Sequence, residues 1–192
     1  MRHSYDAKLS TSIIVPTKFL PWSGSSTPAW YLFPHTLDLA TWYSGQKVES
    51  VYATGTKKLL KSKGIDTYDT IHAIFKLTNG VTVQLLSSFV LPEKLPLRYD
   101  FKIDVIGEKG GLYMNTHDQM VHEIADSYSH VSVLVHPLHG MLVGPPTQML
   151  YSFIEHVRKE IPIEANEIAG RANTAAVAAA HRSIIEGNPI KL

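Results

Sequence analysis

The stretch Tyr31-Leu-Phe-Pro-His-Thr-Leu-Asp-Leu-Ala-Thr-Trp-Tyr-Ser-Gly45 holds the decisive pattern of this 192-residue chain. Apolar residues recur there as on one face of a helix, and a glycine suits the left-handed residue that closes a helix. We therefore predict a helix over residues 30–43, although Pro34 near its start could break off a first turn. His35 and Asp38 lie between apolar residues, which predicts that both point inward.

Downstream of this helix the pattern changes to an alternation of period two. Asn79-Gly80 joins two alternating segments, 70–77 and 81–89, and this dipeptide accepts the two positive φ angles of a type I′ turn. The sequence therefore predicts a hairpin. Further strands are predicted by the same alternation at 47–54, 99–106, 112–115, 119–124 and 131–135.

Upstream of the helix, residues 11–20 are rich in β-branched side chains and are predicted to form a strand. Pro16 confines that strand to an edge or a bulge, because proline cannot donate to a ladder. Residues 21–28, with Ser23-Gly24-Ser25-Ser26, are predicted to form a loop.

Two helices are predicted near the end of the chain. The first, over 147–158, carries a stripe of Met149, Phe153, Ile154 and Val157. The second, over 167–185, is followed by Gly187 and has a face of small residues, namely Ala172, Ala175, Ala176, Ala179 and Ser183. The fold class is therefore α+β, a mostly antiparallel sheet with helices packed on one face and the other face open for oligomerisation.

Composition excludes several classes of protein. The chain has 44% hydrophobic residues, a formal net charge of +1 and no cysteine. A charge this small argues against a nucleic-acid partner, and the lack of cysteine excludes disulfides and thiolate zinc sites. The basic cluster at 57–63 is interpreted as a solvated loop or strand end rather than a phosphate site. No segment has the length and apolarity of a membrane span or a signal peptide, so a cytoplasmic location is expected.

Three segments together resemble the C-terminal domain of the Gfo/Idh/MocA family of NAD(P)-dependent sugar and polyol oxidoreductases. The first, His35-Thr-Leu-Asp-Leu-Ala-Thr-Trp-Tyr-Ser-Gly45, is similar to the family's H-x-x-D-L-x-x-W-x-x-G helix. The second is Phe75-Lys-Leu-Thr-Asn-Gly-Val81 with the turn around Gly107 and Gly110. The third runs from Phe153-Ile-Glu155 to the C-terminal stretch ending in Asn188-Pro-Ile190.

The resemblance implies a division of the chain and of the chemistry. Residues 1–27 would lead into the domain, and residues 28–192 would form a domain for substrate binding and oligomerisation. In the family, NAD or NADP is bound by an N-terminal Rossmann domain, whose G-x-G-x-x-G motif these 192 residues lack. This chain alone is therefore expected to bind no cofactor and to be inactive.

The resemblance also implies a catalytic residue. The family's acid–base pair is an aspartate and a histidine four residues apart; the histidine corresponds to His35, and Tyr31 stands where the aspartate is usual. Oxidation of a secondary alcohol removes the hydroxyl proton as hydride leaves, and histidine titrates in the right range to accept that proton. Tyr31 could donate a hydrogen bond to substrate, although a phenol is a poorer partner than a carboxylate for an imidazolium.

Other candidate residues have structural and functional interpretations side by side. His136 and His139, in the loop before the final helices, are candidates for substrate contact or exposed loop histidines. Together with the 117–123 segment they could hold a metal, but they lack the helical i, i+4 spacing of zinc proteases. Asp38 is interpreted as structural and Trp42 as core. Trp22, Trp30 and Tyr31 could stack on a sugar or belong to the core.

The expected partners are a hydroxylated small molecule and further copies of the chain, a homodimer or homotetramer formed through the open sheet face. A competing hypothesis is a binding or assembly module that kept the fold and lost the chemistry. A third is a metal-dependent hydrolase that uses the histidines. A Ser/His/Asp hydrolase is not indicated, because the sequence has no G-x-S-x-G nucleophile elbow.

Overall fold

The computed structural model describes residues 4–95, 97–117, 122–124, 128–130 and 136–192. The chain forms two compact units. The first comprises residues 1–117 and 171–192, and the second residues 118–170.

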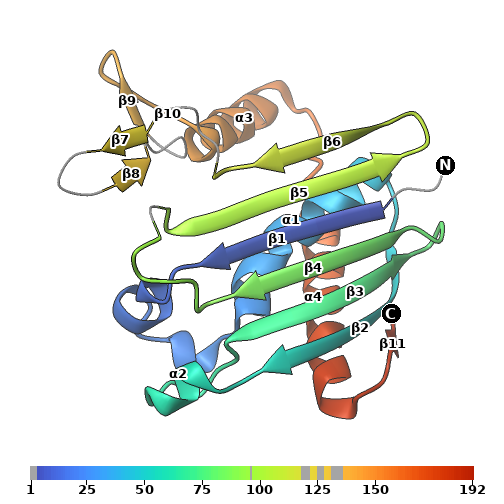
Figure 1. Ribbon diagram of the computed structural model, residues 1–192. Helices are drawn as coiled ribbons and strands as arrows, with labels where there is room; N and C mark the ends of the chain where they lie inside the picture. Colours follow the sequence, from blue (N-terminus) through green and yellow to red (C-terminus); the bar gives the residue numbers. More distant parts are fainter. Residues whose placement is uncertain (1–3, 96, 118–121, 125–127, 131–135) are drawn as a thin grey trace. The chain divides into compact units, whose positions relative to one another are not determined.

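The first unit is built on one seven-stranded sheet, with the strand order β11-β2-β3-β4-β1-β5-β6 (Figure 1). Its strands are β1 (Ser4–Thr11), β2 (Val48–Thr56), β3 (Thr70–Leu77), β4 (Thr82–Ser88), β5 (Tyr99–Gly107), β6 (Gly110–Asn115) and β11 (Ile190–Lys191). Every neighbouring pair is antiparallel except β1 and β4. The predicted α+β class, with a mostly antiparallel sheet, is confirmed.

The hairpin of β3 and β4 is confirmed, but its turn differs from the predicted type I′. Gly80 has a positive φ of 83° and Asn79 does not, so the two positive angles of type I′ are not present. The N–H of Gly80 donates to Leu77 O, and the N–H of Leu77 donates to Val81 O, both at 2.8 Å. This is a three-residue loop in which a glycine after a turn makes a bulge. The side chain of Asn79 supports it by accepting from the N–H of Val81.

The predicted strand over residues 11–20 is wrong. The strand lies earlier, at Ser4–Thr11, and is followed by a π-helical turn, η1 (Val15–Phe19). Pro16 is tolerated at the start of that turn, where an N–H has no helical partner. The alternation of Tyr5, Ala7 and Leu9 with polar residues was the missed signal of β1, because Tyr5 and Leu9 are buried.

The predicted central helix is confirmed as α1 (Pro28–Ser44). Thr27 caps it by accepting a hydrogen bond from the N–H of Trp30, and Gly45 closes it with φ 64°. The helix continues through Pro34, whose carbonyl accepts from the side-chain amide of Asn173. Before α1 in the chain, the predicted loop contains the short 3₁₀ turn η2 (Ser23–Ser25).

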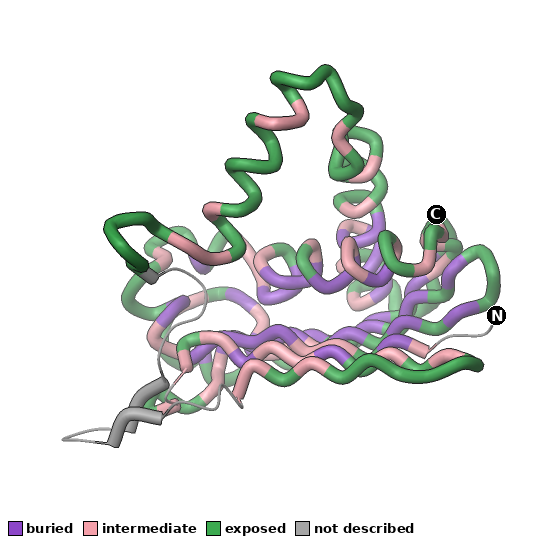
Figure 2. The backbone as a smooth tube through the Cα atoms, turned by 90° about the horizontal axis from the view of Figure 1, so that it is seen from above, coloured by how far each residue is buried: buried purple, intermediate pink, exposed green. Residues whose placement is uncertain are grey.

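The second helix of this unit is α4 (Glu167–Glu186), and α1 and α4 cover the same face of the sheet (Figure 2). Its buried residues are Ala176, Val177, Ala179, Ala180 and Ser183. The predicted small-residue face is therefore wrong for Ala172 and Ala175, which are exposed.

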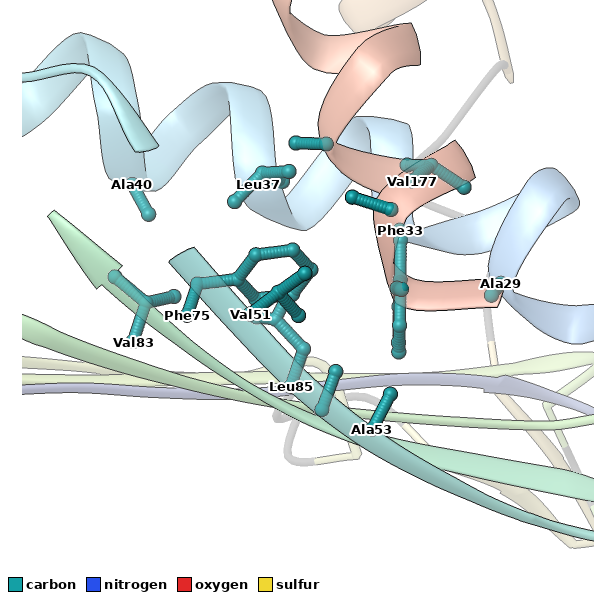
Figure 3. Packing of buried hydrophobic residues seen from close by; sticks show 14 of the residues in the cluster. Ala29, Phe33, Leu37, Ala40, Val51, Ala53, Phe75, Val83, Leu85 and Val177 are labelled. Carbon is teal, nitrogen blue, oxygen red and sulfur yellow. The ribbon is translucent and has the colours of Figure 1, made fainter. Parts of the chain in front are cut away.

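The main core fills the space between these helices and the sheet (Figure 3). Phe33 of α1 meets Phe75 of β3 edge to face, with ring centroids 6.1 Å apart. Val177 of α4 belongs to the same cluster. A second cluster, built on Leu9, Leu32, Leu60 and Phe89, lies below the first half of α1. Trp42, predicted to be core, is 58% exposed instead.

The basic cluster at 57–63 contains a single helical turn, α2 (Leu59–Ser62), rather than a plain loop. The buried carboxylate of Asp69 accepts the backbone N–H groups of Lys58, Leu59 and Leu60 at 2.7–2.8 Å. These three hydrogen bonds fix the position of the turn that carries the lysines.

The second unit contains two short strand pairs and one helix. β7 (His122–Ile124) pairs with β8 (Tyr128–His130), and β9 (His136–Leu138) pairs with β10 (Met141–Val143). The predicted strand at 119–124 corresponds to β7 in its described part, whereas 131–135 lies outside the described residues. The helix α3 (Pro145–Lys159) matches the prediction, but its apolar stripe is exposed. In the described part of the chain, no helix has the length and apolarity needed to cross a membrane.

Candidate functional site

Helix α1 presents the two principal candidates, Tyr31 and His35, one turn apart. Side chains four residues apart lie on one helix face, so both belong to the same side of α1. His35 is exposed, contrary to the predicted inward direction, and Tyr31 is partly buried. The imidazole is therefore open to a ligand, while the phenol has a fixed environment.

That environment is aromatic. The ring of Tyr31 meets Phe89 and Trp22 edge to face, with centroid distances of 5.8 and 6.0 Å. Its hydroxyl lies 3.3 Å from the hydroxyl of Tyr99 on β5. Tyr31 thus has three neighbours, Phe89, Trp22 and Tyr99, that define its position.

The two phenols share one hydrogen bond, in which either hydroxyl can be the donor. Burial and the hydrogen bond to Tyr31 raise the pKa of Tyr99 to about 12, against an opposing effect of Arg98. Tyr99 is therefore protonated at neutral pH and can donate to Tyr31 or accept from it.

The remaining predicted candidates lie in the second compact unit. His139 is exposed and adopts a positive φ of 48° in the turn between β9 and β10. The backbone of His136 pairs with Val143, and its side chain lies outside the described part of the chain. The structure therefore joins Tyr31 and His35 in one unit and places His136 and His139 in the other.

The metal hypothesis concerns residues that are described only in part. Among the described residues, no three side chains of histidine, aspartate or glutamate come together as ligands. The side chains of His122 and Glu123, two of the predicted ligands, lie outside the described part. Asp38, predicted to be structural, is partly exposed on α1.

A third histidine, which the sequence analysis did not single out, anchors the start of α1. His181 of α4 stacks on Trp30, with centroids 5.0 Å apart and planes at 12°. Its Nδ1–H donates to Val177 O, so Nε2 is the acceptor for the hydroxyl of Thr27 at 2.7 Å. Burial lowers the pKa of His181, which keeps the ring neutral, and the hydrogen bond to Val177 opposes this only in part.

The sequence carries no spacing signal for either of these contacts. Thr27 and His181 are 154 residues apart, and Tyr31 and Tyr99 are 68 residues apart. Both pairs follow from the tertiary fold alone. Together they fix the first turns of α1, the part that carries Tyr31 and His35.

A comparison with known protein families identifies the family of this domain. Residues 4–113, more than half of the chain, match the GFO/IDH/MocA C-terminal domain. The chain belongs to this family. No curated protein sequence matches the chain significantly.

Solved structures share the fold of this GFO/IDH/MocA C-terminal domain at low sequence identity. GenD2 from gentamicin A biosynthesis, in complex with NAD, has a TM-score of 0.76 at 17% identity, covering 99% of this chain and 55% of its own. Myo-inositol 2-dehydrogenase from Lactobacillus plantarum has a TM-score of 0.75 at 14% identity, covering 98% and 56%. Scyllo-inositol dehydrogenase from Lactobacillus casei, with bound NAD(H) and scyllo-inositol, has 0.70 at 14% identity, covering 98% and 56%.

The GFO/IDH/MocA domain described here thus spans about half the length of these enzymes. The glycine turn Gly107–Gly110 connects two antiparallel strands, β5 and β6, rather than a strand and a helix. It is therefore unlike the pyrophosphate-binding turn of a dinucleotide site, which opens a helix.

Proposed function

We propose that this domain is the substrate-binding part of an NAD(P)-dependent oxidoreductase that acts on a sugar, a polyol or a related hydroxylated small molecule. The observation that carries the proposal is the pairing on α1 of an exposed imidazole, His35, with the hydroxyl of Tyr31, one helical turn earlier and 3.3 Å from the hydroxyl of Tyr99. An alcohol bound there has a proton acceptor and a hydrogen-bond donor one helical turn apart.

The chemistry assigned to this chain is proton transfer and orientation. His35 would take the hydroxyl proton of a secondary alcohol during oxidation, and would return it during reduction. Tyr31 would donate to a neighbouring oxygen of the substrate and so fix which hydroxyl faces His35. A nicotinamide cofactor, held by a nucleotide-binding domain, would supply the hydride acceptor.

Tyr31 in the usual position of aspartate also favours a second candidate, a binding or assembly module that kept the fold and lost the chemistry. Its neighbour Tyr99 stays protonated at physiological pH, because burial raises the pKa of Tyr99 to about 12. Tyr99 therefore offers an imidazolium at His35 no compensating negative charge. The two candidates differ in whether His35 takes a proton from a bound polyol.

Assembly through the sheet is proposed for both candidates. The face opposite α1 and α4 is exposed and carries Tyr52, Ile74 and Ile106 among polar residues. An antiparallel sheet commonly buries one face in its own core and can use the other for a partner. A second copy of the chain would make the interface between like surfaces, as in most homodimers.

The test of the function uses this chain and two ligand classes. Titration with NADH and NADPH, followed by tryptophan fluorescence, should give no saturable binding. Titration with myo-inositol, followed by the imidazole C–H resonances, should shift the His35 signal in a saturable manner. The matched control is His72, which is exposed on the opposite sheet face and should not move.

Each outcome separates the hypotheses. A silent His35 signal would reject the oxidoreductase proposal, and would leave an assembly role without polyol binding. Saturable micromolar binding of NADH would show that a nucleotide site exists in this chain, and would reject the proposed division of labour. The signal of His35 is assigned from its loss in His35→Gln.

A further inference from the structure

One aromatic side chain beside the candidate site has no role in the core. Trp22 is 49% exposed, and its ring contacts Tyr31 edge to face at 6.0 Å. Tyr31 precedes His35 by one helical turn. An edge-to-face contact occupies at most one face of the indole, so an open aromatic surface adjoins the Tyr31 phenol, one helical turn from His35.

The backbone that carries Trp22 is firmly held. The hydroxyl of buried Ser23 donates to Pro16 O at 2.8 Å, and the N–H of Ser25 donates to Trp22 O at 2.9 Å. The segment is thereby tied to the preceding π-helical turn and to its own 3₁₀ turn. A half-exposed tryptophan on such a fixed loop presents its ring with little loss of entropy on binding.

We propose that Trp22 is a specificity-determining residue that stacks on the ring of a cyclic polyol or a pyranose bound at His35, an inference that rests on the proposed function. The axial C–H groups of such rings are polarised by their oxygens and meet the negative face of an indole favourably. A linear polyol has no rigid C–H face of this kind. Trp22 therefore selects cyclic over linear substrates.

The other two tryptophans have different environments and serve as internal controls. Trp30 is stacked on His181 at 5.0 Å, so one of its faces is already covered. Trp42 lies against Tyr43 near the end of α1, about 10 Å along the helix axis from His35. Because Trp22 contacts Tyr31, one turn before His35, we expect a ligand that touches both Trp22 and His35 to extend away from Trp42.

The experiment follows the three indole N–H resonances of the chain by NMR, assigned from single Trp→Phe variants. Myo-inositol and methyl glucopyranoside should shift the Trp22 resonance in a saturable manner and leave Trp42 unchanged. Sorbitol should bind about tenfold more weakly, as expected when one aromatic contact is lost. The His35 resonance is recorded in the same samples.

Variants then test the side chain itself. Trp22→Ala should weaken the affinity for myo-inositol, measured at His35, about tenfold, while Trp22→Phe should retain most of it. Trp42→Ala is the matched control and should leave the affinity unchanged. Circular dichroism verifies that each variant is folded.

The possible failures are distinguishable. If the His35 signal shifts but Trp22 does not, and Trp22→Ala binds normally, the stacking role is wrong and the proposed function stands. Equal binding of sorbitol and myo-inositol overturns the ring selectivity. If neither signal moves at a ligand concentration on the order of 100 mM, far above the Kd of even a weak site, both proposals are wrong.

Discussion

The hydroxyl of Ser183 joins α4 to the edge of the sheet. It accepts from the N–H of Ala53 on β2 at 3.0 Å and donates to Asn188 O at 2.7 Å. β11 pairs with β2 only at Ser50 and Val51, so Ser183 provides the acceptor that a longer strand would have provided. The side chain is fully buried, which makes the contact costly to remove.

Replacement of Ser183 by alanine should therefore destabilise the fold by about 1 to 3 kcal/mol, because a buried N–H loses its acceptor. The free energy of unfolding in urea measures this loss. Ser25→Ala, at an exposed serine of the loop, is the control and should change stability by less than about 0.5 kcal/mol. Equal effects of the two substitutions would contradict the role given to Ser183.

His181 makes the attachment of α1 to α4 sensitive to pH. Its neutral ring accepts from Thr27 at Nε2, and protonation would place a donor against that hydroxyl. Burial lowers the pKa of His181 in the folded state, below its value in the unfolded chain. Where the folded pKa is the lower of the two, the unfolded state binds more protons as the pH falls.

The contribution of His181 to stability should thus be complete above the unfolded pKa of about 6.5 and be lost as the pH falls towards the folded pKa. Urea midpoints at pH 7.5 and pH 5 measure it. In His181→Gln, which cannot be protonated in this range, the drop between the two pH values should be smaller. An unchanged drop would assign the pH dependence to other groups.

At the scale of residues, the surroundings of a side chain are harder to predict than its place on an element. His35 and Tyr31 are candidates because of the family resemblance, and their common place on α1 is confirmed. The exposure of His35 was not predicted, because the stretch around it is apolar. The Tyr99 hydroxyl under Tyr31 and the His181 ring under Trp30 come from distant segments. Periodicity contains no information about such pairs.

Among the elements, the short helix α2 depends most on a single side chain. Four residues are too few for a stable helix in water, because nucleation costs more than one turn returns. The Asp69 carboxylate compensates by accepting three successive N–H groups at its start. Leu60, fully buried in the second cluster, depends on this turn for its position.

Asp69→Ala should consequently lower the free energy of unfolding by about 2 to 4 kcal/mol, since it leaves buried N–H groups without an acceptor. Urea unfolding provides the value, and protection of the Leu60 amide from hydrogen exchange reports the local effect. Asp66→Ala is the matched control, because Asp66 only forms a surface ion pair with Lys57. Its urea midpoint should be almost unchanged.

The elements that were predicted correctly are those whose signals are local. The β3–β4 hairpin has its turn glycine, and α1 has both its cap and its closing glycine. β1 was missed because its inward residues, such as Ala7, are small or flanked by polar ones. The apolar stripe of α3 was predicted correctly as a pattern, but periodicity did not reveal that its side chains are exposed.

At the scale of the whole molecule, the proposed assembly rests on apolar side chains of the open sheet face. Ile74 lies there on β3, opposite Tyr52 of β2 and Gln84 of β4 in register. These side chains are exposed, and burial of such apolar surface is the main driving force of association. A charge placed at Ile74 would be desolvated in any interface across this face.

Ile74→Arg should therefore shift the protein from dimer or tetramer to monomer at micromolar concentration, as measured by analytical ultracentrifugation. Leu59→Arg, at an exposed leucine of α2 away from that face, is the control and should leave the assembly unchanged. A native chain that sediments as a monomer, or an Ile74→Arg variant that still assembles, would contradict assembly through the sheet.

The position of β1 has a consequence for the order in which the sheet can form during synthesis. β1 is the first strand of this sheet in the order of synthesis, yet its two neighbours begin only at Thr82 and Tyr99. The β2–β3–β4 meander can pair as it is synthesised, whereas β1 cannot pair on both sides until β4 and β5 are present. Closing such a distant pairing is slow, so the nascent chain exposes two unpaired edges until β5 has been translated.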